Sequence, residues 1–202
     1  MLAGIYLLCI PAFMFGQSHL LARRFFWVVL LLSFIVLLCF HKKWNREFVL
    51  AMLLIGTSGF LLEVLAVKTG YVYGYFLFGP TLGYSLWETP LMLAVLWAAY
   101  IYTGRQVAAM IATDTFVVSL VSAALITLLV FFMEPFAVRE GMWSWNGLAI
   151  PKHKYIGVFI SALVFQYVFS KSVKLPPNKL ALPVYLVQLG FFVAMFLLNR
   201  PA

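Results

Sequence analysis

The feature that most constrains the fold of this chain is a series of long, uninterrupted apolar segments. Lipid offers no partner to a bare backbone amide, so membrane-spanning segments are helices or strands of a closed barrel, and barrel strands alternate apolar and polar residues. The runs here are continuous, and 10% of the residues are charged, whereas soluble domains carry about 25%. The sequence therefore predicts an all-α, polytopic transmembrane helix bundle. We expect about seven spans in a single membrane domain, residues 1–202, at roughly 2–16, 24–40, 47–67, 86–103, 113–133, 154–170 and 180–198.

The charge of the chain indicates a membrane-lipid partner and no nucleic acid. Fourteen Lys and Arg against six acids give a formal charge of +8, and cationic loops of membrane proteins lie beside anionic headgroups. No basic cluster is long enough to predict nucleic-acid binding. The predicted loops carry seven Lys or Arg on each side of the membrane, so the count does not orient the protein. We place the short basic loops HKKWNR and KSVKLPPNK in the cytoplasm.

Neither a disulfide nor a metal site is predicted. Cys9 and Cys39 lie inside apolar segments, where they are expected to fill core space. His19, His41 and His153 are scattered without ligand spacing, so we expect no metal, haem or other cofactor.

An internal repeat links two of the predicted helix ends. Residues 63–70 and 134–141 both read E-x-x-A-V-[KR]-x-G, 71 residues apart. Each copy is followed by an aromatic-x-aromatic pair and then by a proline that precedes the next helix. Because two helices separate the copies, both fall at the same membrane face. We predict repeat units at approximately 47–103 and 113–170, with chance similarity in an apolar sequence as the alternative.

Three of the acidic residues have structural explanations. Glu47 lies in the first turn of the third predicted helix, where the helix dipole favours a negative charge. Asp114, in Thr-Asp-Thr before an apolar run, is expected to be an N-cap. Glu140 lies in a polar loop and is expected to be solvated.

The other three acids are candidate catalytic residues. Glu63 and Glu134 each end a long apolar helix, where a negative charge opposes the helix dipole. Their purpose could be to pair with Lys68 and Arg139 in the following loops. Alternatively, the repeat brings two carboxyls together, one protonated and able to donate, the other ionised and able to take a proton from water. Glu88, expected to open the fourth helix at the same face, is the third candidate.

Aromatic residues cluster in the two loops beside these acids. The predicted substrate-binding residues among them are Tyr71, Tyr73, Tyr75, Tyr84, Trp87, Trp143 and Trp145. Trp and Tyr also gather at membrane interfaces, which is the alternative explanation for each residue alone. Because aromatic faces stabilise cations, a site lined by them suits a substrate that becomes a carbocation.

From about residue 63 to residue 157 the chain resembles the membrane carotenoid biosynthesis family that includes carotenoid 1,2-hydratases of the bacterioruberin and gamma-carotene pathways. The resemblance rests on Glu63 with KTGYVYG, Gly79-Pro-Thr-Leu-Gly, Glu88-Thr-Pro-Leu with Trp97, Glu134-Pro-Phe-Ala, Gly141-Met-Trp-Ser-Trp, Ile150-Pro151 and Tyr155. Through this resemblance Trp97 joins the predicted substrate-binding residues. It also implies an integral protein of a prokaryotic cell (inner) membrane that acts on a long polyene.

The resemblance implies hydration of the terminal 1,2 double bond of an acyclic carotenoid, without a cofactor. An acid protonates the alkene, aromatic faces hold the tertiary cation, and a base assists the attack of water. The chain departs from the family pattern at Phe76 and Phe78, where tyrosines are usual. It departs again at Leu96, where a polar residue is usual, and at Val130, where an aspartate is usual. These apolar replacements bear on water addition more than on the fold or the ligand.

Two other functions compete with hydration. A lycopene-cyclase-type protein would share the protonation step, but a neighbouring double bond would capture the cation, and a drier site favours this outcome. A carotenoid- or lipid-binding protein without catalysis would use its carboxyls only to pair with Lys68, Arg139 or Lys154. Product mass separates the two reactions, because hydration adds one water and cyclisation gives an isomer.

Overall fold

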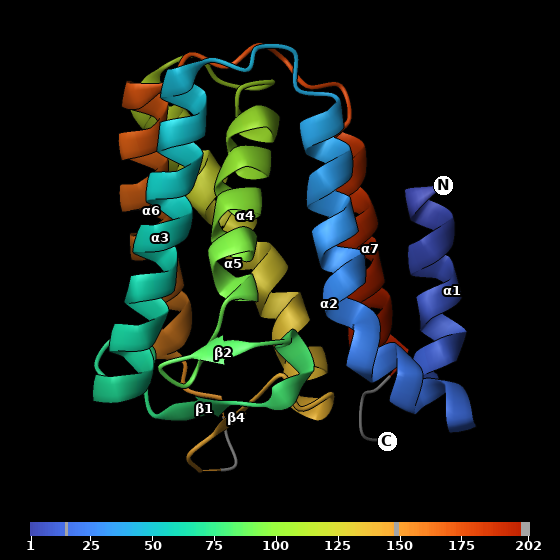
Figure 1. The fold of residues 1–202 in the computed structure, drawn as a ribbon. Coiled ribbons are helices and arrows are strands. Elements are labelled where there is room, and N and C mark those ends of the chain that lie inside the picture. Colours follow the sequence, from blue (N-terminus) through green and yellow to red (C-terminus); the bar gives the residue numbers. More distant parts are fainter. Residues whose placement is uncertain (15, 148–149, 199–202) are drawn as a thin grey trace.

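Helices make up most of the computed structural model, which describes residues 1–14, 16–147 and 150–198 (Figure 1). In these residues the helices are α1 (Leu2–Met14), α2 (Gly16–Cys39), α3 (Arg46–Thr69), α4 (Met92–Ala108), α5 (Thr115–Arg139), α6 (His153–Ser172) and α7 (Ala181–Leu198). The short strands are β1 (Phe76–Phe78), β2 (Ser85–Leu86), β3 (Thr89–Pro90) and β4 (Trp143–Trp145), with a 3-10 turn, η1 (Pro80–Leu82). The predicted all-α helix bundle is confirmed.

Five helices of the described chain are long and apolar enough to cross a membrane. They are α2 from Ser18 onward, α3, α5, α6 and α7. The other two helices are shorter, with 13 residues in α1 and 17 in α4. A full span needs about 20 residues, so these two helices are shorter than that length and the predicted count of about seven spans is not confirmed.

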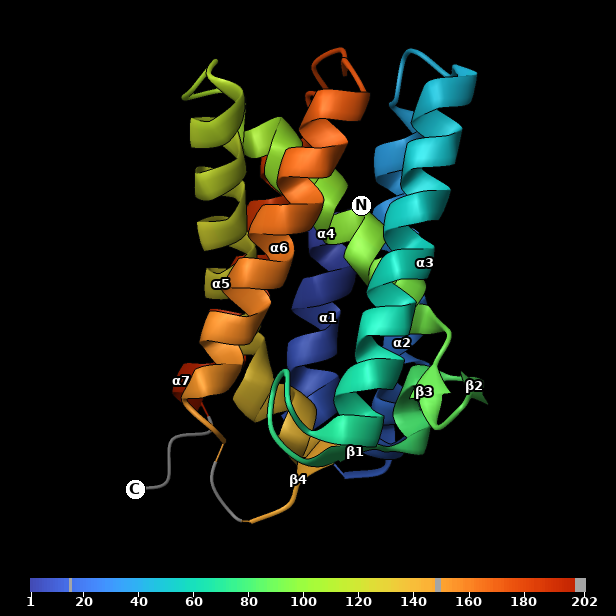
Figure 2. The same cartoon turned by 90° about the vertical axis from the view of Figure 1, so that its left-hand side faces the viewer.

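The helices alternate in direction and place the loops at two ends. One end carries the connections 40–45, 109–114 and 173–180, and we call it the upper end (Figure 1). The opposite, lower end carries all four strands (Figures 1 and 2). Both long loops of the predicted repeat therefore lie at the same end.

Helix termini follow from local capping chemistry. The Asn45 side chain accepts a hydrogen bond from the Phe48 amide (3.1 Å) at the start of α3. Asp114 accepts from two amides at the start of α5, which confirms the predicted N-cap. Helix α3 ends where Gly70 adopts a left-handed conformation (φ 69°), a backbone state that glycine adopts without a steric penalty.

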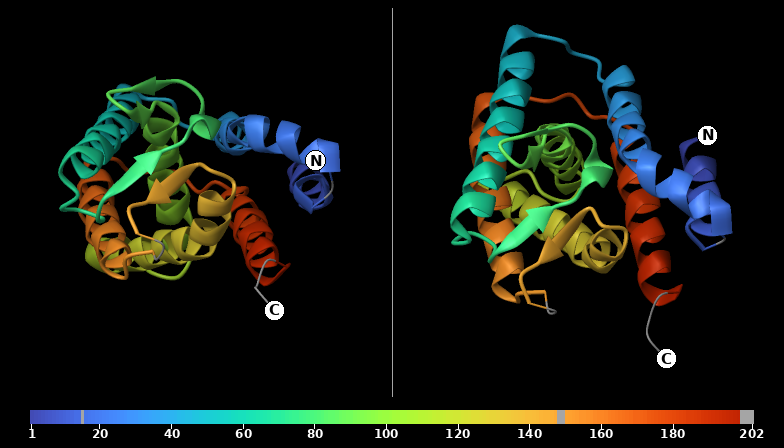
Figure 3. Two further views of the ribbon diagram at one scale, coloured as in Figure 1. Left: turned by 90° about the horizontal axis from the view of Figure 1, so that it is seen from below. Right: turned by 60° about the horizontal axis from the view of Figure 1, so that its bottom comes forward.

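Helix α4 forms the centre of the bundle. Of its 17 residues, 14 are buried, as expected for a helix surrounded by others. Helices α2, α3, α5, α6 and α7 all contact it, whereas α1 packs at the edge against α2 and α7. Seen from below, strands β1 and β4 pass across the lower end of α4 (Figure 3). The short central helix thus leaves space that the two long loops close.

The two long loops are joined by an antiparallel strand pair. In β1 and β4, Phe76 pairs with Trp145 and Phe78 with Trp143. The aromatic pair that follows the first copy of the repeat, Tyr71 and Tyr73, does not lie in this strand. Residues 71–73 instead form a turn closed by a hydrogen bond from the Gly74 amide to the Gly70 carbonyl (3.0 Å).

The predicted start of the fourth helix at residue 86 is wrong. Residues 85–90 form a β-hairpin in which Leu86 pairs with Thr89, and α4 begins at Met92. The two turn residues, Trp87 and Glu88, have φ angles of 52° and 65°, as a two-residue type I′ turn requires. Glu88 therefore lies at a hairpin tip and not in the first turn of a helix.

Helices α3 and α5 are also longer than predicted. They continue to Thr69 and Arg139, so Glu63 and Glu134 lie inside the helices and not at their ends. Helix α5 runs through Pro135, which costs one backbone hydrogen bond, but the next two residues, Phe136 and Ala137, are buried and hold the last turns in place.

Candidate active site

A cavity of about 70 Å³ lies between α3, α4, α5 and α6, above the β1–β4 pair. Its wall is almost entirely apolar and aromatic. The side chains with polar atoms that line it are Glu63, Tyr73, Trp97, Tyr100, Trp143, Trp145 and Lys154. A water needs about 10–15 Å³ of such space, so the cavity has room for a few waters or a slender chain end.

Glu134 lies behind one wall of this cavity and holds three of the side chains that line it. Its side chain is fully buried. One carboxylate oxygen accepts hydrogen bonds from the indole N–H groups of Trp143 and Trp145, both at 2.7 Å. The other oxygen pairs with the ammonium of Lys154. Because three donors satisfy this carboxylate, it is held as an ionised anchor for three cavity-lining side chains.

Lys154 is a site residue for which sequence reasoning gave no functional role. Its side chain is 9% exposed, and its ammonium lies 4.8 Å from the ring centroids of both Trp143 and Trp145. Buried lysines are rare unless paired, and here the carboxylate and two aromatic faces supply the partners. The sequence names Lys154 only as one of three possible cation partners of the carboxyls, and the structure selects it as the partner of Glu134.

Glu63 faces the cavity in a different electrostatic setting. It is buried, and it accepts a hydrogen bond from the Trp97 indole N–H at 3.0 Å. Among the described residues it forms no salt bridge. Glu63 lines the cavity directly, whereas Glu134 reaches it through its hydrogen bonds to Trp143 and Trp145.

A glycine positions the indole that contacts Glu63. Gly59 lies one turn before Glu63 on the same face of α3. A Cβ atom at Gly59 would come within 2.4 Å of the Trp97 ring. The missing side chain therefore lets Trp97 pack closely against α3 and reach the carboxyl.

The floor of the cavity is an aromatic layer from both loops. The ring of Phe76 lies 5.1 Å from Trp145 and 5.0 Å from Phe78, and Phe78 lies 6.2 Å from Trp143. All four departures from the family pattern, Phe76, Phe78, Leu96 and Val130, line the cavity. The replacements thus make the wall of this one cavity less polar.

The Tyr73 hydroxyl is the one neutral hydroxyl group at the cavity without a hydrogen-bond partner among the described residues. Burial raises the pKa of the Tyr73 phenol well above its ordinary value, and the nearby Glu63 carboxylate raises it further. Tyr73 therefore stays protonated and presents an O–H group toward the cavity.

Several predicted site residues lie outside the cavity. The side chains of Tyr71, Tyr75, Tyr84 and Trp87 are exposed at the lower end. Glu88 is 65% exposed and forms a 2.8 Å salt bridge with Lys68. Of the predicted residues, the structure brings together Glu63, Glu134, Tyr73, Trp97, Trp143 and Trp145.

The expectation that Glu140 is solvated is wrong. Its side chain is fully buried, and it binds His19 and Arg139 at 2.7 Å each. Helix α2 covers this part of the loop, so the carboxylate ties α2 to the end of α5. It lies outside the cavity lining and is a structural ion cluster.

No metal centre is apparent in residues 1–14, 16–147 and 150–198, where no group of three or more His, Cys, Asp or Glu side chains is arranged to hold an ion. Among the described residues, the cavity presents one buried carboxyl without a cation partner, one phenol without a hydrogen-bond partner, the Glu134–Lys154 ion pair and a lining of aromatic faces. Such a set can transfer a proton to a hydrophobic substrate and hold a cation.

Comparison with known proteins identifies the family. A family model described as "Carotenoid biosynthesis protein" matches residues 25–200. No curated protein and no solved structure matches the chain. The family match spans every element around the cavity and most of the chain. On this evidence the chain belongs to the carotenoid biosynthesis protein family.

Proposed function

We propose that the chain protonates the terminal double bond of an acyclic carotenoid in this cavity and adds water to the resulting cation. The observation that carries the proposal is the contrast between two buried carboxyls: Glu134 is neutralised by Lys154, and Glu63 faces the cavity without a cation partner among the described residues. An unpaired carboxylate is costly to bury, so Glu63 is the group suited to carry a proton.

In the first step the Glu63 carboxylic acid donates its proton to the less substituted carbon of the alkene. The pair of π electrons forms the new C–H bond, and the more substituted carbon becomes a tertiary cation. The carboxylate left behind and the faces of Trp97, Phe76 and Phe78 stabilise that cation. Lys154 does not oppose it, because Glu134 cancels the ammonium charge.

In the second step a water attacks the cationic carbon and loses its proton to the Glu63 carboxylate. A carbon–oxygen bond forms, an O–H bond breaks, and Glu63 regains its proton, so one water is added and no cofactor is consumed. The Tyr73 hydroxyl supplies a further polar partner for that water. A buried water needs two to four such partners, and Glu63 and Tyr73 together provide them.

Cyclisation is the second candidate, because the wall at Phe76, Phe78, Leu96 and Val130 is apolar. The protonation step is identical, but a neighbouring double bond of the same polyene then attacks the cation. Loss of a proton back to Glu63 completes an isomerisation. The two reactions share their acid and differ only in what reaches the cation first.

Expression in a lycopene-producing bacterium tests these reactions. Hydration is expected to give a product heavier than lycopene by one water, and cyclisation a product of unchanged mass. The Glu63→Gln variant is expected to lose at least about 100-fold in product, the usual contribution of a positioned acid. Glu47→Gln, the same change at the surface end of α3, serves as the matched control. Unchanged pigments from the wild type would instead indicate carotenoid binding without this chemistry, and normal conversion by Glu63→Gln would show that Glu63 is not the acid.

A further inference from the structure

A second pocket lies at the upper end of the molecule, opposite the aromatic cavity. It has a volume of about 260 Å³ and is lined by the end of α4 and by the loop 173–180. Two cationic side chains, Arg105 and Lys179, line it together with apolar Met110 and Leu175, and none of its lining residues is acidic. The pocket is therefore electropositive.

The walls of this pocket are fixed by hydrogen bonds between α4 and the loop. The Gln106 side-chain amide donates to the Pro176 carbonyl (2.9 Å) and accepts from the Asn178 amide (3.0 Å). The Asn178 side chain in turn donates to the Tyr102 hydroxyl (2.9 Å) and to the Leu37 carbonyl (2.8 Å). This network holds the loop, and with it Lys179, in a defined position beside Arg105.

Beside this network lies a buried donor that has no hydrogen-bond partner among the described residues. The Nε–H of Arg105 is buried and has no hydrogen-bond acceptor among the described residues. Arg105 also forms no salt bridge in that part of the chain. Leaving a buried charged donor unmet costs more than leaving a neutral one, so the guanidinium is prepared for an acceptor that enters from outside.

The charge of the whole upper end favours an anion. Seven cations lie there, Lys42, Lys43, Arg46, Arg105, Lys171, Lys174 and Lys179, against two acids, Glu47 and Asp114. All four salt bridges of the described residues belong to the lower end. The pocket lies at the negative end of the α4 dipole, so attraction of an anion depends on these side chains and not on the helix backbone.

We propose that this pocket binds the phosphate of an anionic phospholipid headgroup. Arginine matches the geometry of phosphate oxygens through two parallel N–H donors, and basic pockets between helices at the cytoplasmic side of membrane proteins bind anionic headgroups. Met110, which is 56% exposed at the rim, suits contact with the acyl chain of the same lipid. The site is separate from the aromatic cavity and independent of the reaction proposed there.

Native mass spectrometry of the purified full chain tests the proposal. Protein exchanged into detergent with equal amounts of phosphatidylglycerol and phosphatidylcholine is expected to retain phosphatidylglycerol selectively. The Arg105→Gln variant is expected to lose this retention by about fivefold or more, the effect of one cation near a headgroup. Arg105→Lys, which keeps the charge, is expected to fall between the two.

Lys43→Gln is the matched control, because it removes one charge from the same end without touching the pocket. Equal losses from Lys43→Gln and Arg105→Gln would overturn the pocket and indicate diffuse attraction. A titration with inorganic phosphate alone separates the sources, since binding of phosphate without retention of phosphatidylglycerol would overturn the lipid assignment. Unchanged retention by an Arg105→Gln protein of wild-type melting temperature would overturn the proposal entirely.

Discussion

Among single residues, the two buried carboxyls, Glu63 and Glu134, differ in the charge of their hydrogen-bond partners. Glu134 has a cation and two indole donors, whereas Glu63 has one indole. Both lie in the same low-dielectric region, but only Glu63 faces the cavity. The proposed roles follow from this difference: Glu63 moves the proton, and Glu134 fixes the aromatic wall and Lys154.

The Glu134→Gln variant is expected to lose product and stability together. A glutamine would leave Lys154 without its counter-charge, and breaking a buried ion pair on one side costs about 3–5 kcal/mol. Thermal unfolding in detergent and pigment analysis measure the two losses. The double variant Glu134→Gln, Lys154→Met removes both charges and is expected to recover much of the stability but not the product. Recovery of both would show that Glu134 has only a structural role.

The Gly59→Ala variant is expected to move Trp97 away from Glu63. The added methyl would collide with the indole, and overpacking of this kind costs about 1–3 kcal/mol. Product formation is expected to fall while the helical circular dichroism stays. Gly190→Ala in α7 is the matched control, since nothing lies within 4 Å of its Cβ position. Equal activity of the two variants would contradict the positioning of Trp97 by Gly59.

Sequence spacing located the acids of the site better than its aromatic residues. Glu63 and Glu134 were predictable because acids inside apolar segments are rare and the repeat matches them. Tyr71 and Tyr75 carry the same local signal as Tyr73, but only Tyr73 turns inward. Which tyrosine is buried depends on the turn between Gly70 and Gly74. The amino-acid composition of this segment does not predict which residue of the turn points inward.

At the scale of elements, the helices were predictable and the strands were not. Hydropathy places α1, α3, α6 and α7 within about two residues. The other three differ more: α2 begins at Gly16 and not at residue 24, α5 ends at Arg139 and not at residue 133, and α4 runs from Met92 to Ala108 and not over 86–103. Strands β1 and β4 pair across 65 or more residues of sequence, and three-residue strands have no periodicity to detect. The pairing decides which aromatic residues form the cavity floor, so the floor could not be predicted without the structure.

The Gly79→Ala variant is expected to separate the two loops while leaving the helices folded. A Cβ atom at Gly79 would lie 2.0 Å from the Gly141 carbonyl oxygen, beside the hydrogen bond from the Gly79 amide to the Met142 carbonyl. Hydrogen exchange is expected to rise in residues 71–86 and 140–147 but not in the helices. Leu77→Ala, on the exposed face of the same strand, is the control. Unchanged protection in Gly79→Ala would argue against this contact as the closure of the cavity.

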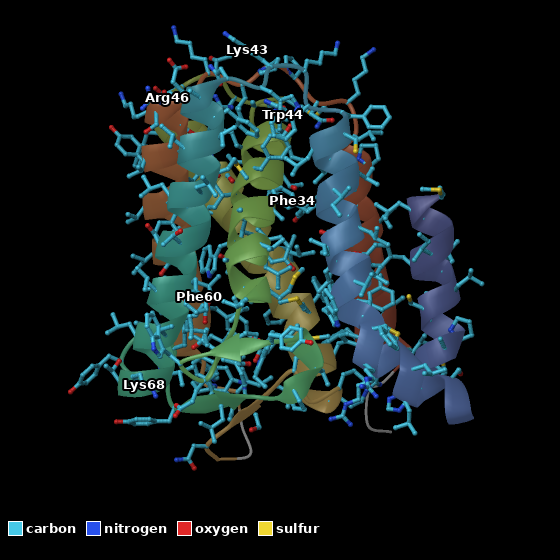
Figure 4. The ribbon with its side chains drawn as sticks, viewed as in Figure 1. Phe34, Lys43, Trp44, Arg46, Phe60 and Lys68 are labelled. Atoms are coloured by element: carbon cyan, nitrogen blue, oxygen red, sulfur yellow. The ribbon has the colours of Figure 1, made fainter. Side chains whose placement is uncertain are left out.

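Across the whole molecule, the two ends differ in whether their cations are paired with acids. Lys68, Arg139 and Lys154 are paired with acids at the lower end, whereas the seven upper cations form no salt bridge with the described residues. In Figure 4, Lys43 and Arg46 lie at the upper end and Lys68 lies at the lower end. Equal Lys and Arg counts in the sequence conceal this asymmetry, because pairing is visible only in the structure.

The unpaired cations predict that the upper end faces the cytoplasm. Anionic lipids concentrate in the cytoplasmic leaflet and attract each nearby cation by about 1 kcal/mol, and paired cations contribute less to this attraction. Single cysteines at Lys43 and at Tyr84, which is 90% exposed at the lower end, test the orientation in a chain with Cys9 and Cys39 replaced by alanine. A membrane-impermeant maleimide is expected to label Tyr84→Cys on intact cells and Lys43→Cys only after permeabilisation. The reverse pattern would place the anionic-lipid pocket in the outer leaflet, where anionic lipids are scarcer. It would count against the cytoplasmic placement of the upper end and against the lipid proposal.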